Sequence, residues 1–82
     1  MQLSVEMSKY PLADDYITPI KGFIEQLNQY PDIKVLTNTM STQLFGDYDT
    51  VMLALQACIK WSFEHYGKVV FVVKFIHGDL RP

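Results

Sequence analysis

Two segments with helical periodicity, each lying between segments with strand periodicity, constrain the fold of this sequence most. The first begins after Thr18, a good N-cap, with Pro19 at the first helical position, and Pro31 ends it. Its apolar stripe consists of Ile20, Phe23, Ile24, Leu27 and Tyr30. Gly22 costs a helix interior about 1 kcal/mol relative to Ala, so tight packing or a close neighbour has to justify it. We therefore predict a helix between Thr18 and Pro31.

The second helical segment follows Gly46 and Asp47, and the Asp47 side chain can act as its N-cap. Its apolar residues recur at steps of three and four: Tyr48, Met52, Leu55, Ile59, Phe63 and Tyr66. Gly67 then stands where helices commonly take a left-handed terminator. The pattern predicts a helix of nearly five turns that ends before Gly67.

The first segment of the chain has the alternation of a half-buried strand. The apolar set is Leu3, Val5 and Met7, and the polar set is Ser4, Glu6 and Ser8. We expect the apolar set to face the helices and the polar set to face away from them.

Strand character also dominates residues 33–45 and residues 68–77. The first of these is too long for a typical strand, so we expect two strands with a turn near residues 38–42. The second is apolar on both faces. The order is therefore β-α-β-β-α-β, which is typical of a ferredoxin-like α+β fold: a four-stranded antiparallel sheet with two helices on one face. No repeat or linker divides the sequence, and we expect residues 1–82 to form one domain.

The sheet face away from the helices carries more apolar surface than a solvated face needs. Its expected members are Leu36, Asn38 and Met40 on the second strand and Val70, Val72, Lys74 and Ile76 on the last. Of the 82 residues, 49% are hydrophobic, and a chain this short buries only about 60–65% of its surface. We therefore expect a homodimer assembled through this sheet face.

Charge and motif content exclude several function classes. The net charge of −2 gives no electrostatic reason to bind nucleic acid. One cysteine, Cys58, allows no intramolecular disulfide, and His65 and His77 lack paired metal-ligand spacing, so we expect no metal site. There is no Gly-x-Ser-x-Gly motif, no signal peptide and no apolar run long enough to cross a bilayer. We expect a cytoplasmic protein without catalytic residues.

Two features leave a choice between surface and site. Glu6 is a carboxylate in the middle of a strand, and it needs either Lys74 or a ligand as a partner. Ser41, Thr42 and Gln43 form either ordinary strand surface or the wall of a small-molecule site. Composition and spacing alone do not decide between these alternatives.

Three stretches resemble the YkoF-like family of thiamine- and hydroxymethylpyrimidine-binding proteins. They are YPLADDYITPIKGFIEQLN (10–28), TNTMSTQLFGDYDTVM (37–52) and VVFVVKFIHGDL (69–80). The resemblance implies a ferredoxin-like domain that binds the pyrimidine part of thiamine without turnover, in precursor uptake or salvage, with a transporter as a possible partner. The founding members join two such domains, so a single-domain chain would rebuild that arrangement as a homodimer or dimer of dimers.

The resemblance makes the MSTQ stretch (40–43) and the SKY stretch (8–10) the best positions for a ligand. An aminopyrimidine needs a hydrogen-bond acceptor and a donor, an aromatic ring to stack on, and a partner for its hydroxyl group. The candidate ligand-binding residues are Glu6, Ser8, Tyr10, Asn38, Ser41, Thr42, Gln43 and Tyr48. No cofactor is expected besides thiamine or hydroxymethylpyrimidine as bound ligand.

Two alternatives remain open. A small enzyme of the dimeric α+β barrel kind uses the same βαββαβ unit and would need Glu6 or His77 for proton transfer. A regulatory or structural module would use the open sheet face for assembly alone.

Overall fold

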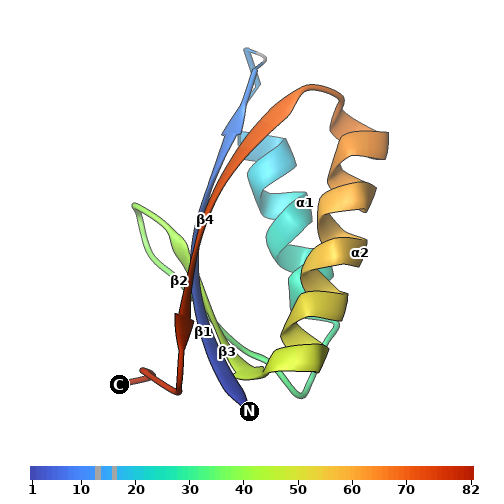
Figure 1. Ribbon diagram of the computed structural model, residues 1–82. Coiled ribbons are helices and arrows are strands. Elements are labelled where there is room, and N and C mark those ends of the chain that lie inside the picture. Colours follow the sequence, from blue (N-terminus) through green and yellow to red (C-terminus); the bar gives the residue numbers. More distant parts are fainter. Residues whose placement is uncertain (13, 16) are drawn as a thin grey trace.

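The computed structural model describes residues 1–12, 14–15 and 17–82; Ala13 and Tyr16, within the stretch 10–28, lie outside the described residues. The elements are β1 (Gln2–Pro11), α1 (Ile17–Leu27), β2 (Lys34–Thr37), β3 (Thr42–Asp47), α2 (Tyr48–Tyr66) and β4 (Val69–His77). The strands form one antiparallel sheet in the order β2-β3-β1-β4, and both helices cover the same face (Figure 1). The predicted ferredoxin-like α+β fold is confirmed.

The core lies between the helices and one face of the sheet. Leu3, Val5 and Met7 are almost fully buried there, as their alternation predicts. The other strands and the helices contribute Phe23, Leu27, Ile33, Leu44, Val51, Ala54, Leu55 and Cys58. Burial of this apolar surface is the main stabilising term for so small a domain.

The turn and the second cap form where the sequence places them. The segment 33–45 divides into β2 and β3, joined by residues 38–41. Asp47 accepts hydrogen bonds from the N–H groups of Asp49 (3.2 Å) and Thr50 (3.4 Å) and so caps α2. Gly67 follows α2 with a φ of 75°, a conformation that glycine adopts without strain.

The first helix begins earlier than its sequence indicates. Thr18 was predicted as the N-cap, but α1 already starts at Ile17 and Thr18 lies inside its first turn. The Asp15 carboxylate accepts a hydrogen bond from the Thr18 N–H at 3.2 Å. A carboxylate before the helix, and not the Thr18 hydroxyl, therefore caps a free N–H group of the first turn. The helix ends at Leu27, four residues before Pro31.

The buried face of α2 also differs from the predicted stripe. Its core side consists of Val51, Ala54, Leu55, Cys58 and Ser62. Tyr48 and Phe63 of the predicted stripe are 39% and 48% exposed. Small residues let the helix pack close to its neighbours, so the ring of Phe63 lies at the margin, edge-on to Phe71 with 5.6 Å between centroids.

The open face of the sheet is partly covered by the end of the chain. Ser4 is almost completely buried on this face because its hydroxyl donates to the Gly78 carbonyl (2.7 Å) and accepts from the Leu80 N–H (2.9 Å). The Arg81 guanidinium lies 6.0 Å from the ring centre of Phe45, which is also buried. No local sequence pattern predicts this cover.

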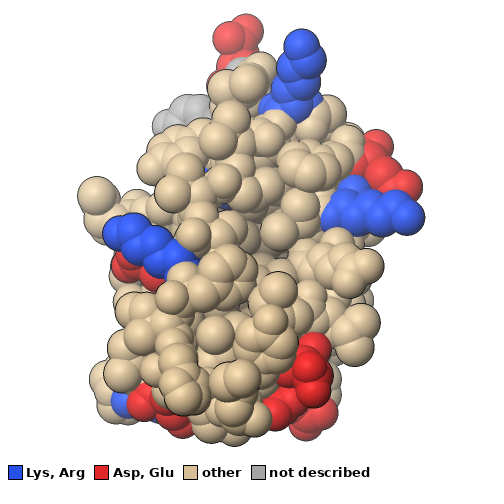
Figure 2. Space-filling model, viewed as in Figure 1, with Lys and Arg blue, Asp and Glu red and all other residues tan. Residues whose placement is uncertain are grey.

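The β4 part of the open face is exposed as predicted, and Leu36 of β2 is half-buried. The expectation that Asn38 and Met40 lie on the second strand was wrong, because β2 ends at Thr37 and both residues belong to the turn that follows it. Val70, Val72, Lys74 and Ile76 of β4 all lie on the surface. In the view of Figure 2 the surface is mostly uncharged, with charged side chains scattered and no large patch of one sign. No helix in the described parts of the chain is long and apolar enough to span a membrane.

Candidate functional site

The sheet contains a notch where β3 ends beside β1. Pairing between the two strands stops at Met7 and Thr42, whereas β1 continues with β4 as far as Pro11 and Val69. The turn between β2 and β3 bends away from the sheet at this point (Figure 1). The last residues of β1 therefore have a strand neighbour on one side only.

A cavity of about 230 Å³ lies at this notch, and we call it the notch cavity. Its walls come from β1 (residues 7–10), from the β2–β3 turn (residues 37–42) and from Ile20, Phe23 and Ile24 of α1. The helix supplies apolar side chains, and the turn supplies mostly polar ones. Apolar walls with a few converging polar groups are the usual composition of a small-molecule site.

The turn is held rigid by Asn38. Its side-chain Oδ1 accepts hydrogen bonds from the N–H groups of Met40 (2.8 Å) and Ser41 (2.9 Å), and its own N–H donates to the Ser41 carbonyl at 3.0 Å. The side-chain NH₂ group of Asn38 takes no part in these bonds. The turn thus presents an amide donor on a backbone whose shape is already set.

Lys9 also lines the notch cavity; it lies inside the SKY stretch but is not among the eight candidate residues. Its ammonium donates to the Pro19 carbonyl at 2.6 Å and lies 5.0 Å, 5.1 Å and 5.6 Å from the ring centres of Phe23, Tyr66 and Phe71. Burial lowers the pKa of the Lys9 amine to about 8. The signal was present, because Lys9 follows Leu3, Val5 and Met7 in the same alternation and so has to face the helices.

Five of the eight candidate residues line the notch cavity. They are Ser8, Tyr10, Asn38, Ser41 and Thr42. Tyr10 is 54% exposed, whereas Thr42 is buried, so the group runs from the mouth of the cavity to its wall. The SKY and MSTQ stretches come together because the register pairs Met7 with Thr42.

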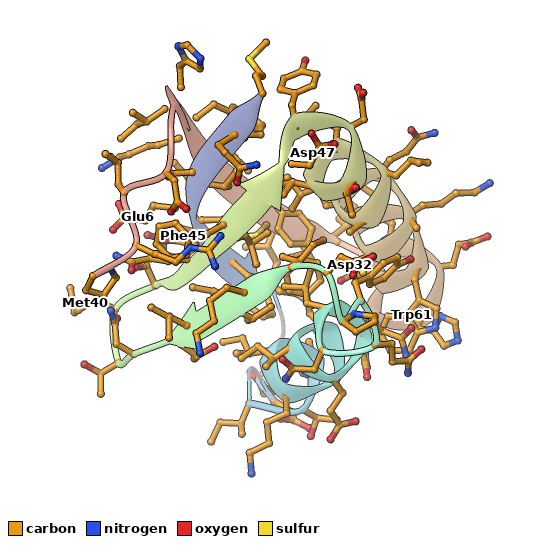
Figure 3. All side chains as sticks on the ribbon, turned by 90° about the horizontal axis from the view of Figure 1, so that it is seen from below. Glu6, Asp32, Met40, Phe45, Asp47 and Trp61 are labelled. Carbon is orange, nitrogen blue, oxygen red and sulfur yellow. The ribbon has the colours of Figure 1, made fainter. Side chains whose placement is uncertain are left out.

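Glu6 and Gln43 lie instead on the open face of the sheet. They line a second hollow of about 180 Å³ together with Lys74 and the buried ring of Phe45, and we call it the open-face hollow. Figure 3 shows Glu6 and Phe45 on this side of the sheet, away from Trp61 in the helix layer. The carboxylate of Glu6 pairs with the Lys74 ammonium at 3.4 Å, the structural alternative considered from the sequence.

One hydrogen bond joins the two regions. The Ser41 hydroxyl, which lines the notch cavity, donates to the Glu6 carboxylate at 3.3 Å. The Glu6–Lys74 pair is substantially exposed, so its contribution to stability is small. Glu6 therefore borders the notch cavity only through Ser41.

Tyr48 does not join either group. It begins α2 at the opposite end of β1, where its N–H donates to the Met1 carbonyl at 2.8 Å. His77 pairs with Leu3 near the same end of the sheet. The proton-transfer groups weighed for an enzyme, Glu6 and His77, thus both lie outside the lining of the notch cavity.

Cys58 belongs to the core. It is 2% exposed on α2, and burial raises the pKa of its thiol, which disfavours the reactive thiolate. Among the described residues, no three His, Cys, Asp or Glu side chains gather in a way that could hold a metal ion.

A protein-family model, the YkoF-related family, matches residues 2–77. The chain belongs to the YkoF-related family. The resemblance seen in the three sequence stretches is thereby confirmed. The comparison with curated proteins found no match.

Solved structures with the same fold include hypothetical protein MJ1052 of Methanocaldococcus jannaschii. It is 28% identical, with a TM-score of 0.81 over 99% of this chain and 84% of that one. Protein TM0486 of Thermotoga maritima, described as a candidate thiamine biosynthesis or salvage protein, is 14% identical, with a TM-score of 0.84 over 95% and 85%. A domain of unknown function, DUF77, from Bacillus cereus is 16% identical, with a TM-score of 0.75 over 98% and 79%. The last two likenesses show a shared fold.

Proposed function

We propose that this YkoF-related protein binds thiamine or its hydroxymethylpyrimidine moiety without chemical turnover and serves uptake or salvage of thiamine precursors. The notch cavity carries the proposal, because it gathers five of the eight candidate residues between an apolar helix and a polar turn. Family membership and the description of the Thermotoga maritima protein support the choice of ligand.

The size of the notch cavity favours the pyrimidine over the whole vitamin. Pockets for drug-sized ligands enclose roughly 300–1,000 Å³, whereas this cavity measures about 230 Å³. A single substituted ring fits that volume, and the thiazolium of thiamine would extend past Tyr10 toward solvent. The apolar side chains of Ile20 and Ile24 would cover one face of the ring.

The polar groups of the cavity match the hydroxymethyl and amino substituents. The hydroxyls of Ser8 and Thr42 can each donate and accept a hydrogen bond, and the Asn38 NH₂ group can donate. Tyr10, at the cavity mouth, would stack against the part of the ligand ring that faces solvent.

We further propose that the protein acts in the cytoplasm as a homodimer or homotetramer joined through the open sheet face. Val70, Val72 and Ile76 are 46–50% exposed there around the Glu6–Lys74 pair, and a partner copy would cover them. We also propose a transporter of thiamine precursors as a further partner.

Titration calorimetry tests the ligand. We expect saturable heat at micromolar concentrations with hydroxymethylpyrimidine, and with thiamine. Ile20→Trp should fill the notch cavity and abolish binding, while Gln43→Ala, which alters only the open-face hollow, should retain it. Unchanged circular dichroism and mass in solution provide the control for folding. No heat from the folded wild type would refute the proposal, and loss in Gln43→Ala alone would place the ligand on the open face.

A further inference from the structure

The main-chain groups of β1 alternate between its two neighbours. The Gln2 carbonyl accepts from the Gly78 N–H (2.9 Å), and the Leu12 N–H donates to the Lys68 carbonyl (3.2 Å). Both contacts extend the β1–β4 ladder, so the even-numbered residues of β1 direct their N–H and C=O groups toward β4. The Met1 carbonyl accepts from the Tyr48 N–H (2.8 Å), which extends the β1–β3 ladder. Odd-numbered residues therefore point toward β3.

This alternation reaches the notch at Lys9. The residue is odd-numbered, and the β1–β3 ladder has already ended at Met7, so the N–H and C=O of Lys9 point into the space that β3 leaves. The next odd-numbered residue is Pro11, which has no N–H. Among the described residues of β1, Lys9 is thus the one that offers both a main-chain donor and an acceptor at this free edge.

The side chain of Lys9 lies away from this edge, and the β1–β4 ladder holds the main chain. The side chain turns to the helix face, where its ammonium binds the Pro19 carbonyl and lies among three aromatic rings. Residues 8–10 remain in the β1–β4 ladder on the other side. The main chain of Lys9 is therefore held in a strand conformation against the cavity, with little ordering left for a ligand to impose.

We propose that the main chain of Lys9 reads the hydrogen-bonding edge of the ligand, which is a planar ring carrying a donor and an acceptor side by side. Its C=O accepts from the exocyclic amine of an aminopyrimidine, and its N–H donates to the adjacent ring nitrogen, as a neighbouring strand would. This inference rests on the proposed function and deepens it. It assigns ring recognition to the backbone and leaves the side chains of the turn to the hydroxymethyl group.

Amide hydrogen exchange followed by NMR tests the pairing in the wild-type protein, with hydroxymethylpyrimidine as the probe. At saturation, exchange of the Lys9 amide should slow by at least about tenfold, the equivalent of one hydrogen bond. The amides of Val5 and Ser8, which already lie in the ladders, should change little. An analogue of the probe without the exocyclic amine should bind at least about tenfold more weakly.

A pair of variants separates the main chain from the side chain. Lys9→Met removes the amine but keeps the N–H, and its affinity should stay within about threefold of wild type. Lys9→Pro also removes the N–H, which no neighbouring strand uses, and should lose at least about tenfold. Binding with unchanged Lys9 exchange would overturn this inference and leave the proposed function intact. Absence of binding by the wild type would overturn both.

Discussion

Gly22 lies where α1 meets the ring of Tyr66, and replacing it tests how closely the two helices pack. Alanine is normally more favourable than glycine inside a helix, by about 1 kcal/mol. Here a Cβ atom on residue 22 would clash with the Tyr66 hydroxyl and lie 3.1 Å from the ring carbon that bears it. The ring cannot move freely, because it packs edge-on to Trp61 with 5.5 Å between centroids and lies 5.1 Å from the Lys9 ammonium.

Overpacking of this kind costs roughly 1–3 kcal/mol. Set against the gain in helix propensity, Gly22→Ala should lower the free energy of unfolding by about 1 kcal/mol. In a Tyr66→Ala background the clash is gone, and the same substitution should raise it by about 1 kcal/mol. The two effects correspond to a coupling of about 2 kcal/mol. Urea unfolding, followed by circular dichroism, measures all four proteins.

The reversal of sign is the decisive result of that cycle. If Gly22→Ala stabilises the wild type as much as it stabilises Tyr66→Ala, the close approach of the two helices is refuted. The position of Tyr66 as one of the three rings around the Lys9 ammonium would then be refuted as well.

Three further perturbations test other contacts. Lys9→Met should stabilise the protein most at neutral pH and less as the pH rises from about 8 toward 10.5. The reason is that burial lowers the pKa of the Lys9 amine, so the unfolded wild-type chain binds more protons than the folded one in that window. A stability difference that does not change with pH would contradict this. Ser4→Ala should lower the free energy of unfolding by about 1–3 kcal/mol, because it removes the hydrogen bonds to the Gly78 and Leu80 backbone. Urea unfolding measures this loss, with Ser8→Ala as the comparison, and equal losses in the two variants would argue against the C-terminal cover. Asp47→Ala should lower the melting temperature more than Asp49→Ala does, because the ionised Asp47 carboxyl accepts hydrogen bonds at the start of α2, and these donors, the N–H of Thr50 first, lower its pKa. The difference between the two variants should vanish as the pH falls through that pKa. A difference that persists in acid would point to another cause.

Local patterns predicted much of the fold because their physical causes are local. The alternation of Leu3, Val5 and Met7 determines which side of β1 is buried, and Asp47 and Gly67 delimit α2 through bonds within a few residues of themselves. The face of α2 could not be predicted in this way. It is apolar on more than one side, and the small residues that allow close packing decide which side faces the core.

The site depends on contacts between distant segments. The sequence indicated that the stretches 8–10 and 40–43 matter, but only the strand register brings them together at the notch. The alternation already predicted that Glu6 faces away from the helices, whereas the position of Gln43 beside it follows from the register. The cover of Ser4 by Leu80 joins residues 76 positions apart, and no local pattern encodes it. Lys9 was predictable in its direction but not in its surroundings, which require α1 to be in place.

An NMR titration of the uniformly labelled protein with hydroxymethylpyrimidine shows whether the notch cavity is the binding site. We predict saturable chemical-shift changes that cluster at residues 8–10, at residues 37–42 and at Ile20 and Ile24 on α1. Shifts that cluster around Glu6, Gln43 and Lys74 instead, or no shifts at millimolar ligand, would contradict the claim that the notch cavity is the binding site.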